Sequence, residues 1–117
     1  MRQEKGKKEM KVKDLIDGKS IKEINLSDPE REISGVYIGD LLSWVMGRAK
    51  ENDAWITIMS NINVAAVASL ADVACVILAE NVSLEKEVEK VIKDKKINVL
   101  SSSIPAYETA ILISEKL

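Results

Sequence analysis

The sequence predicts an α/β fold: a layered, mostly parallel sheet of about five strands with helices packed on it. Short β-branched runs alternate along the chain with segments whose apolar residues recur at helical spacing. Residues 54–79 hold a strand, a tight turn, a helix and a second strand, which is the length of a βαβ unit with parallel strands. A chain of 117 residues, 46% hydrophobic and 31% charged, has the size and composition of one globular domain.

We expect residues 1–9 to form a flexible basic tail and residues 10–117 to form a single domain. Residues 1–13 carry six basic and two acidic side chains, whereas the whole chain has a net charge of −2. The start of the chain is therefore either a plain solvated tail or an electrostatic arm. The acidic remainder argues against a nucleic-acid surface. With one cysteine and no secretory leader, the expected location is cytoplasmic.

The apolar stretch 62–79 has only three polar residues and approaches the length of a membrane span. Asp72 would lie well inside such a span, at a cost of several kcal/mol, and the stretch is rich in alanine, which contributes little to insertion. We therefore expect a buried strand at 54–59, a helix that begins near Asn61 and ends at Asp72, and a second buried strand at 73–79. The alanines would let this helix lie close to the sheet or to another subunit.

The segments that follow continue the alternation. Ser83 is the expected N-cap of a helix with acidic residues in its first turn, lysines in its last turn and a single apolar stripe. Its charged residues form a solvated face. Residues 97–102 are the next expected strand, and a last helix has Pro105 in its first turn.

Upstream of the βαβ unit, residues 12–16 form a short expected helix and residues 20–26 alternate as an edge strand. Residues 32–39 are the next strand, in which Gly35 marks an expected bulge, and Asp40 caps a helix that follows it. The complete order is α-β-β-α-β-α-β-α-β-α, which places helices on a mostly parallel sheet.

Much catalytic and metal-binding chemistry is missing from the sequence. There is no histidine, so the commonest general base and metal ligand is absent and a Ser–His or Cys–His nucleophile is excluded. Cys75 falls in a predicted buried strand, where we expect an inert core residue. Neither a dinucleotide loop nor a Walker-type phosphate loop occurs. We expect no enzyme activity, no metal and no cofactor, although carboxylates alone can do acid–base work.

The candidate ligand site lies at the carboxyl ends of the strands, where loops enter helix N-termini. Ligands of open parallel sheets bind at this edge, and the free N–H groups of helix N-termini attract an anion or a nucleotide phosphate. Each expected loop carries small polar residues, which act either as helix caps alone or as caps that also contact a ligand. The candidate residues are Gly39, Asp40, Ser60, Asn61, Asn63, Glu80, Asn81, Ser101, Ser102 and Ser103.

The only tryptophans, Trp44 and Trp55, have two interpretations. Trp44 shares a helix face with apolar neighbours, and Trp55 begins a buried strand. We favour a core or dimer contact for both over stacking on a ligand base.

Four blocks of the chain resemble the DRTGG domain family, in its layout from about Lys11 to Leu117. The blocks are KVKDLIDG, REISGVYIGDLLSWVMGRAK, WITIMSNINVAAVASLADVACVILAENV and INVLSSSIPAYETA. The small free-standing DRTGG-domain proteins look most similar. The resemblance implies a fold similar to the N-terminal domain of HPr kinase/phosphorylase. In larger proteins the domain accompanies CBS-domain pyrophosphatases and phosphotransacetylases, which implies a regulatory or dimerising module.

The residues that name the family differ in this chain. Asn61 and Ile62 stand where the Asp-Arg pair would fall, and Ala79, Glu80 and Asn81 stand where Thr-Gly-Gly would fall. Loss of the arginine removes a bidentate phosphate donor, and loss of two glycines closes off a tight approach of the backbone. If the family site binds a phosphate, this chain is expected to bind something else there, or nothing.

Three functions are open on this reading. The first is a non-catalytic regulatory, ligand-sensing or adaptor domain that forms a homodimer and binds a small anionic or nucleotide ligand. The second is a pure protein-interaction module that docks through Trp44 and the basic arm, without a ligand. The third is an orphan phosphoryl-handling enzyme that uses carboxylates such as Asp40 and Glu80. We favour the first.

Overall fold

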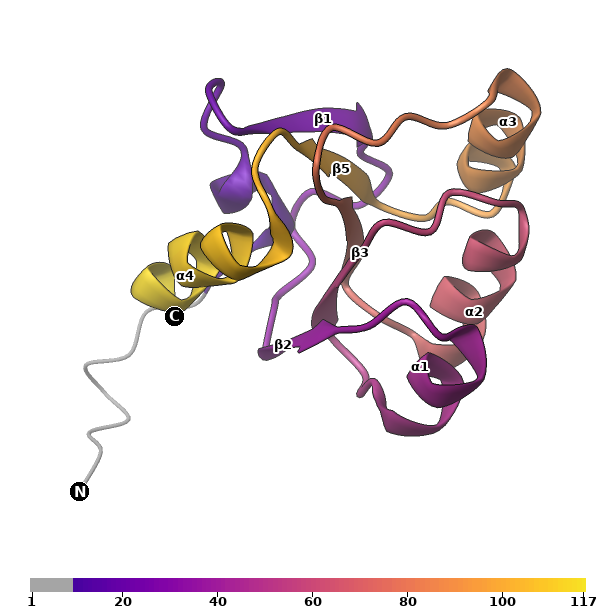
Figure 1. Ribbon diagram of the computed structural model, residues 1–117, viewed down its shortest axis with the longest axis horizontal. Helices are drawn as coiled ribbons and strands as arrows, with labels where there is room; N and C mark the ends of the chain where they lie inside the picture. Colours follow the sequence, from indigo (N-terminus) through magenta and orange to yellow (C-terminus); the bar gives the residue numbers. More distant parts are fainter. Residues whose placement is uncertain (1–9) are drawn as a thin grey trace.

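The computed structural model describes residues 10–117, so the expected basic tail, residues 1–9, lies outside the described residues. Ten elements follow one another in the described chain (Figure 1). They are η2 (Val12–Leu15), β1 (Ile21–Asn25), β2 (Gly35–Ile38), α1 (Leu42–Arg48), β3 (Asp53–Thr57), α2 (Asn63–Ala71), β4 (Cys75–Leu78), α3 (Lys86–Asp94), β5 (Val99–Ser102) and α4 (Ala106–Lys116).

A single five-stranded sheet has the order β1-β5-β4-β3-β2. Strands β2 to β5 are parallel, and β1 pairs antiparallel with β5 at one edge. In the parallel part Val36 pairs with Ala54, Ala54 pairs with Cys75, and Val76 pairs with Val99. The predicted α/β fold with a mostly parallel sheet is confirmed.

Helices cover both faces of this sheet. Each step from β2 to β5 moves one place in the same direction through one helix, and right-handed crossovers of this kind put all their helices on one face. Figure 1 shows α1, α2 and α3 gathered on one side of the sheet and α4 on the other. Val45, Val64 and Ile92 pack on the first face, while Leu15 and Ile113 pack on the second.

The apolar stretch of the sequence is the centre of this three-layer core. All four residues of β4 are fully buried, because alternate side chains enter the two opposite apolar clusters. In α2, Ala65 and Ala68 are buried against the sheet side, while Ala66 points outward. None of the helices within residues 10–117 is long and apolar enough to span a membrane.

Two predicted helix caps are wrong. Helix α1 has Leu41 at its N-cap without a side-chain bond, because the Asp40 carboxylate instead bonds to the end of β3. Helix α3 begins later than expected, after Glu85, so Ser83 caps nothing. Helix α2 has Ile62 at its N-cap without a side-chain bond, but the Oδ1 of the preceding Asn61 accepts the N–H of Asn63 at 2.9 Å.

Two further expectations at the start of the chain also differ from the structure. Gly35 pairs in regular register with Asp53 and marks no bulge; a Cβ there would lie 2.9 Å from an Asp53 carboxylate oxygen. The irregular register lies in β1, between Glu23 and Asn25. The first helix is a 3-10 helix of four residues.

Asp17 holds the turn that leads into β1. Its Oδ1 accepts three backbone N–H groups, from Lys19, Ser20 and Ile21, at 2.8–2.9 Å. These bonds, first of all that from Ile21, lower the pKa of the Asp17 carboxyl from its usual value. The carboxylate therefore stabilises the fold at neutral pH.

We expect Asp17→Ala to lower the free energy of unfolding by about 1–2 kcal/mol at pH 7, because three N–H groups lose their acceptor. Since the folded-state pKa is depressed, the unfolded chain takes up the proton first, and this contribution disappears as the pH falls below about 4. Urea unfolding at pH 7 and pH 3 measures both effects. Asp17→Asn is the control, because it keeps an acceptor oxygen without a titrating charge. An Asn variant with the same acid destabilisation as the wild type would contradict this assignment.

Candidate functional site

The loops that carry the candidate residues meet at one edge of the sheet. Because β2 to β5 are parallel, the segments after all four strands lie at their shared carboxyl edge. Backbone bonds tie neighbouring loops together: Ala79 N–H donates to the Thr57 carbonyl, and Asn81 N–H donates to the Ser102 carbonyl, at 2.9 and 2.8 Å. The topology therefore brings the candidate positions of all four loops to the same rim.

Asp40 links the loop after β2 to the end of β3. Its Oδ1 accepts the Thr57 hydroxyl at 2.7 Å and the Ile58 N–H at 3.0 Å. The Thr57 hydroxyl also accepts the N–H of Met59 at 3.1 Å. One oxygen of Asp40 thus orders the loop that leads to α2, so the residue has a structural role at this edge.

Gly39 is fixed from two sides at the same corner. The indole Nε1 of fully buried Trp55 donates to the Gly39 carbonyl at 2.8 Å. A Cβ at Gly39 would lie 2.9 Å from a ring carbon of Tyr37, so a larger residue would displace that ring. The predicted core role of Trp55 is confirmed, and its single polar atom organises the loop.

Trp44 is different from Trp55. It lies on α1 with 54% of its surface exposed, so the core alternative is wrong for this residue and the dimer contact stays a prediction. The Arg48 guanidinium lies 3.9 Å from the centre of its ring, a cation–π contact one helical turn away. The stack covers one side of the indole and leaves the rest open.

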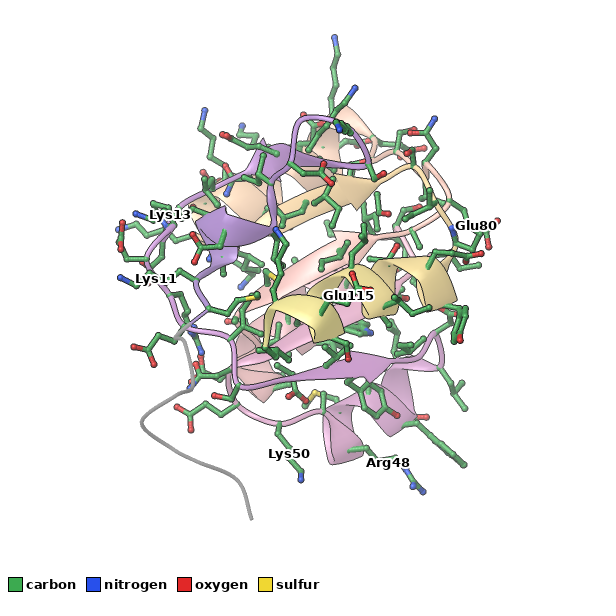
Figure 2. All side chains as sticks on the ribbon, turned by 90° about the vertical axis from the view of Figure 1, so that its left-hand side faces the viewer. Lys11, Lys13, Arg48, Lys50, Glu80 and Glu115 are labelled. Atoms are coloured by element: carbon green, nitrogen blue, oxygen red, sulfur yellow. The ribbon has the colours of Figure 1, made fainter. Side chains whose placement is uncertain are left out.

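Glu80 and Asn81 form a tight corner after β4. Both have left-handed backbones, with φ of 58° and 61°, although neither is glycine. Their N–H groups donate to the carbonyls of Ile104 and Ser102, which fixes the corner against the loop after β5. In Figure 2 Glu80 lies at the rim of the molecule, with its side chain directed outward.

The three candidate serines after and within β5 occupy different environments. Ser101 is paired within the sheet and half-buried. Ser102 is fully buried, and its hydroxyl lies 2.7 Å from that of fully buried Thr109 on α4. Ser103 is exposed at the rim, where its N–H donates to the Ser20 carbonyl. Of the three, Ser103 alone presents its side chain to solvent fully.

Cys75 lies in the middle of the sheet and away from this edge. The thiol is fully buried in β4, and desolvation raises its pKa to about 12. Such a thiol stays protonated at neutral pH and is a poor nucleophile. Within residues 10–117, no three acidic, cysteine or histidine side chains come together as a metal site.

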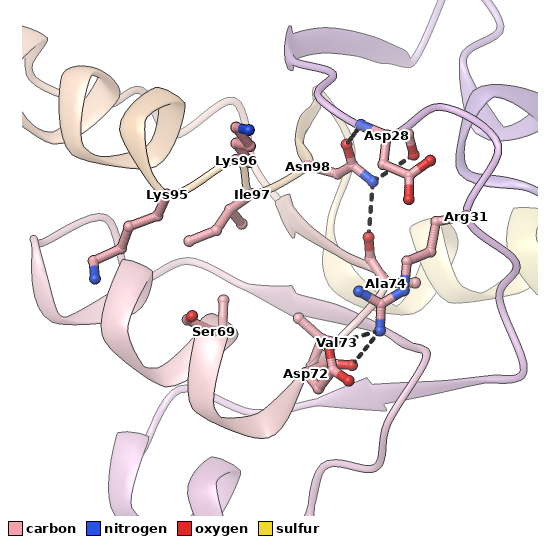
Figure 3. Close-up of a pocket in the computed structure, with 11 residues that line it drawn as sticks. Asp28, Arg31, Ser69, Asp72, Val73, Ala74, Lys95, Lys96, Ile97 and Asn98 are labelled. Atoms are coloured by element: carbon pink, nitrogen blue, oxygen red, sulfur yellow. Dashed lines mark hydrogen bonds and ion pairs between the residues drawn. The ribbon is translucent and has the colours of Figure 1, made fainter.

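The opposite, amino edge of the sheet has a small cavity that the sequence did not indicate. It has a volume of about 160 Å³ and lies between the ends of α2 and α3. Figure 3 shows Arg31 reaching Asp72, and Asn98 between Asp28 and Ala74. Its lining residues are Asp28, Arg31, Ala68, Ser69, Asp72, Val73, Ala74, Lys95, Lys96, Ile97 and Asn98.

Two polar side chains build the wall of this cavity. Arg31 donates to Asn52 Oδ1 at 2.9 Å and forms an ion pair with Asp72, also at 2.9 Å. Buried Asn98 accepts the Asp28 N–H at 2.8 Å and donates to the Asp28 and Ala74 carbonyls. Asn98 lies between Ile97 and Val99, and a polar amide within such an apolar segment is the sequence signal that could have pointed to it. Both residues tie loops together.

A second, more open groove of about 340 Å³ runs between α3 and β1. Ile24 and Asn25 line one side, and Lys86, Glu89, Lys90 and Lys93 line the other. The lysines are exposed, as expected for the solvated face of a charged helix.

Comparison with known protein families places this chain in a family of α/β domains. The DRTGG domain family matches residues 13–116, which is nearly the whole chain. The chain belongs to the DRTGG domain family. No curated protein sequence gives a significant match.

A solved structure shares the fold. It is the crystal structure of the CBS and DRTGG domains of the regulatory region of Clostridium perfringens pyrophosphatase, complexed with its activator diadenosine tetraphosphate. The TM-score is 0.69 at 17% sequence identity. The match covers 83% of this chain and 43% of the pyrophosphatase chain, so this chain corresponds to less than half of that regulatory region.

The corner at Glu80 and Asn81 has a backbone conformation that favours glycine. The resemblance to the family implies that these two residues stand where the Gly-Gly of the motif would fall, and both have the positive φ that glycine adopts without strain. For a residue with a Cβ, this conformation costs about 1–2 kcal/mol.

Glu80→Gly is expected to raise the free energy of unfolding by about 0.5–1 kcal/mol, because relief of the strain exceeds the added freedom of glycine in the unfolded chain. Asn81→Gly should raise the free energy of unfolding by less, since asparagine tolerates this conformation better than glutamate does. Urea unfolding of each variant measures the change. Ser83→Gly, at an exposed position without positive φ, is the control and should be neutral or destabilising. A Glu80 variant destabilised like this control would contradict the account.

Proposed function

We propose that this chain is a non-catalytic, cytoplasmic regulatory domain that works as a homodimer and senses a small anionic ligand, in particular a nucleotide, at the carboxyl edge of its sheet. Three lines support the proposal. The chain belongs to a family whose member in the pyrophosphatase lies in a regulatory region that binds a nucleotide activator. Its candidate residues meet at one rim. The chain has no histidine, and its single cysteine is buried and stays protonated.

The arrangement of helix ends around the sheet is the main support for a ligand site at the carboxyl edge. Helices α1, α2 and α3 each follow a parallel strand, so their N-termini lie at the carboxyl edge and their C-termini at the amino edge. Helix N-termini attract negative charge and C-termini repel it. An anion therefore favours the rim of Ser60, Asn61 and Ser103 over the cavity beside Lys95.

Small residues at this rim leave the backbone accessible. Ser60 is half-exposed, and Asn61 and Asn63 are exposed at the start of α2. The Asn61 side chain already caps Asn63, so the remaining N–H groups of this turn are the donors for a phosphate. Since the family arginine is replaced by Ile62, the anion would be held by backbone and hydroxyl groups.

The ligand proposal predicts a thermal shift. Diadenosine tetraphosphate, ATP, AMP and pyrophosphate are the probes, each in excess over the protein. A ligand at one hundred times its dissociation constant should add about 2.7 kcal/mol, which raises the melting temperature by about 10 °C for a domain of this size. We expect the double variant Ser60→Ala/Asn63→Ala to reduce the shift, because it removes the Ser60 hydroxyl and the Asn63 amide while it leaves the backbone N–H groups in place.

The matched control lies at the other edge. Lys95→Ala removes a positive charge from the amino-edge cavity, so it should leave the shift unchanged if the ligand binds at the rim. The reverse pattern, loss with Lys95→Ala and retention in the double variant, would move the ligand to the amino edge. The absence of a shift with every probe would overturn ligand sensing and favour the protein-interaction function.

The homodimer is tested separately by light scattering on the full chain. We expect a mass twice the 12.9 kDa of one chain at micromolar concentration. A monomer at that concentration would overturn this part of the proposal and leave the ligand result standing.

A further inference from the structure

Exposed apolar side chains are distributed unevenly among the elements of the fold. Ten large hydrophobic residues of the described chain are at least 36% exposed, and none of them lies on β1, β4, β5 or α3. They lie on β2, α1, α2 or α4, at the caps of α1 and α4, or in the segment after β3. They are Ile38, Leu41, Trp44, Met46, Ile58, Ile62, Leu70, Tyr107, Ile111 and Leu117.

This distribution follows the two edges of the sheet. Figure 1 shows β1 with α3 at one end of the sheet and β2 with α1 at the other. The α3 lysines line the groove at the β1 end, whereas the β2 end exposes Ile38, Leu41, Trp44 and Met46 together with Arg48. The two edge strands are therefore exposed to different surroundings.

The β1 edge is protected against pairing with another strand. Asp17 occupies both outward groups of Ile21: its side chain accepts the Ile21 N–H, and its own N–H donates to the Ile21 carbonyl. The irregular register after Glu23 interrupts the strand, and Lys22 and Glu23 are charged and exposed. Each of these is a known device that blunts an edge strand.

The β2 edge has none of these devices. Its sequence, GVYI, has no charge, no proline and no bulge. Gly39 donates to the Ile56 carbonyl of β3, and main-chain groups alternate along a strand, so those of Val36 and Ile38 face away from the sheet. Within residues 10–117, no hydrogen bond outside the sheet reaches the main-chain groups of Val36 or Ile38. Among residues 10–117, nothing pairs with the outer edge of β2.

We propose that β2 pairs antiparallel with β2 of a second copy of this chain, which joins the two sheets into one continuous ten-stranded sheet. The inference rests on the homodimer proposed above and names its interface. A two-fold axis makes antiparallel pairing of identical strands self-complementary, and an uncharged strand does not repel its copy. The outward groups of Val36 and Ile38 receive partners in this arrangement.

Side chains next to β2 complete the surface. Helix α4 packs on β2 and β3, and its exposed Tyr107 and Ile111 lie one turn apart. On the other face, α1 presents Leu41 and Trp44. With Ile38 these side chains expose on the order of 600 Å², most of the roughly 800 Å² that each partner buries in a stable dimer. The area favours a second copy over a short peptide.

The test of the β2 interface combines the molecular mass in solution, measured by light scattering, with hydrogen exchange of single amides. Ile38→Lys places a positive charge on the open edge, near its symmetry mate, and should raise the dimer dissociation constant at least tenfold by light scattering. Leu70→Lys is the matched control: Leu70 is 72% exposed but lies at the end of α2, so its variant should remain a dimer. Circular dichroism checks that both variants are folded.

Hydrogen exchange of single amides reports the pairing directly. The Val36 amide should exchange slowly in the dimer and at least tenfold faster in Ile38→Lys, while the Tyr37 amide, which faces β3, stays protected in both. A dimer whose stability is unchanged by Ile38→Lys, or whose Val36 amide exchanges freely, would overturn the β2 interface alone. A monomeric wild-type chain would overturn both the interface and the homodimer.

Discussion

Burial of β3 and β4 on both faces is the constraint on which the rest of the fold depends. Trp55, Ile56, Val76 and Ile77 are fully buried, with alternate side chains in opposite clusters, so each face needs a helical cover. The βαβ steps supply one cover with α1, α2 and α3. The other face is closed only when the chain returns with α4 and the N-terminal η2. Both ends of the described chain are thus tied to the same core.

The sequence predicted the elements well because their apolar periods are strong, but it predicted their ends poorly. Asp40 and Ser83 are good cap residues, yet one bonds to Thr57 of a neighbouring strand and the other precedes the helix by a turn. Which residue caps a helix depends on tertiary contacts, and these cannot be read from the spacing of neighbouring residues in the sequence. The same holds for Gly35, whose small size serves a close approach to Asp53 instead of a bulge.

At the candidate site, the sequence located the rim but not the orientation of its side chains. Parallel strands oblige their following loops to share an edge, so the positions could be read from strand order alone. The Ser102 side chain points inward, and its hydroxyl contacts that of Thr109 on α4. The alternation of residues along β5 does not predict this contact. The amino-edge cavity was missed for a similar reason, since Arg31 and Asn98 meet their partners across long sequence separations.

The buried thiol of Cys75 has a practical consequence. Because the only cysteine of the chain is enclosed by the sheet and stays protonated, the folded protein should resist maleimide and iodoacetamide reagents without any substitution. A cysteine introduced at an exposed position would then be the sole reactive point. Fluorophores or spin labels can be attached there to the otherwise native chain, and distances between two copies can be read spectroscopically.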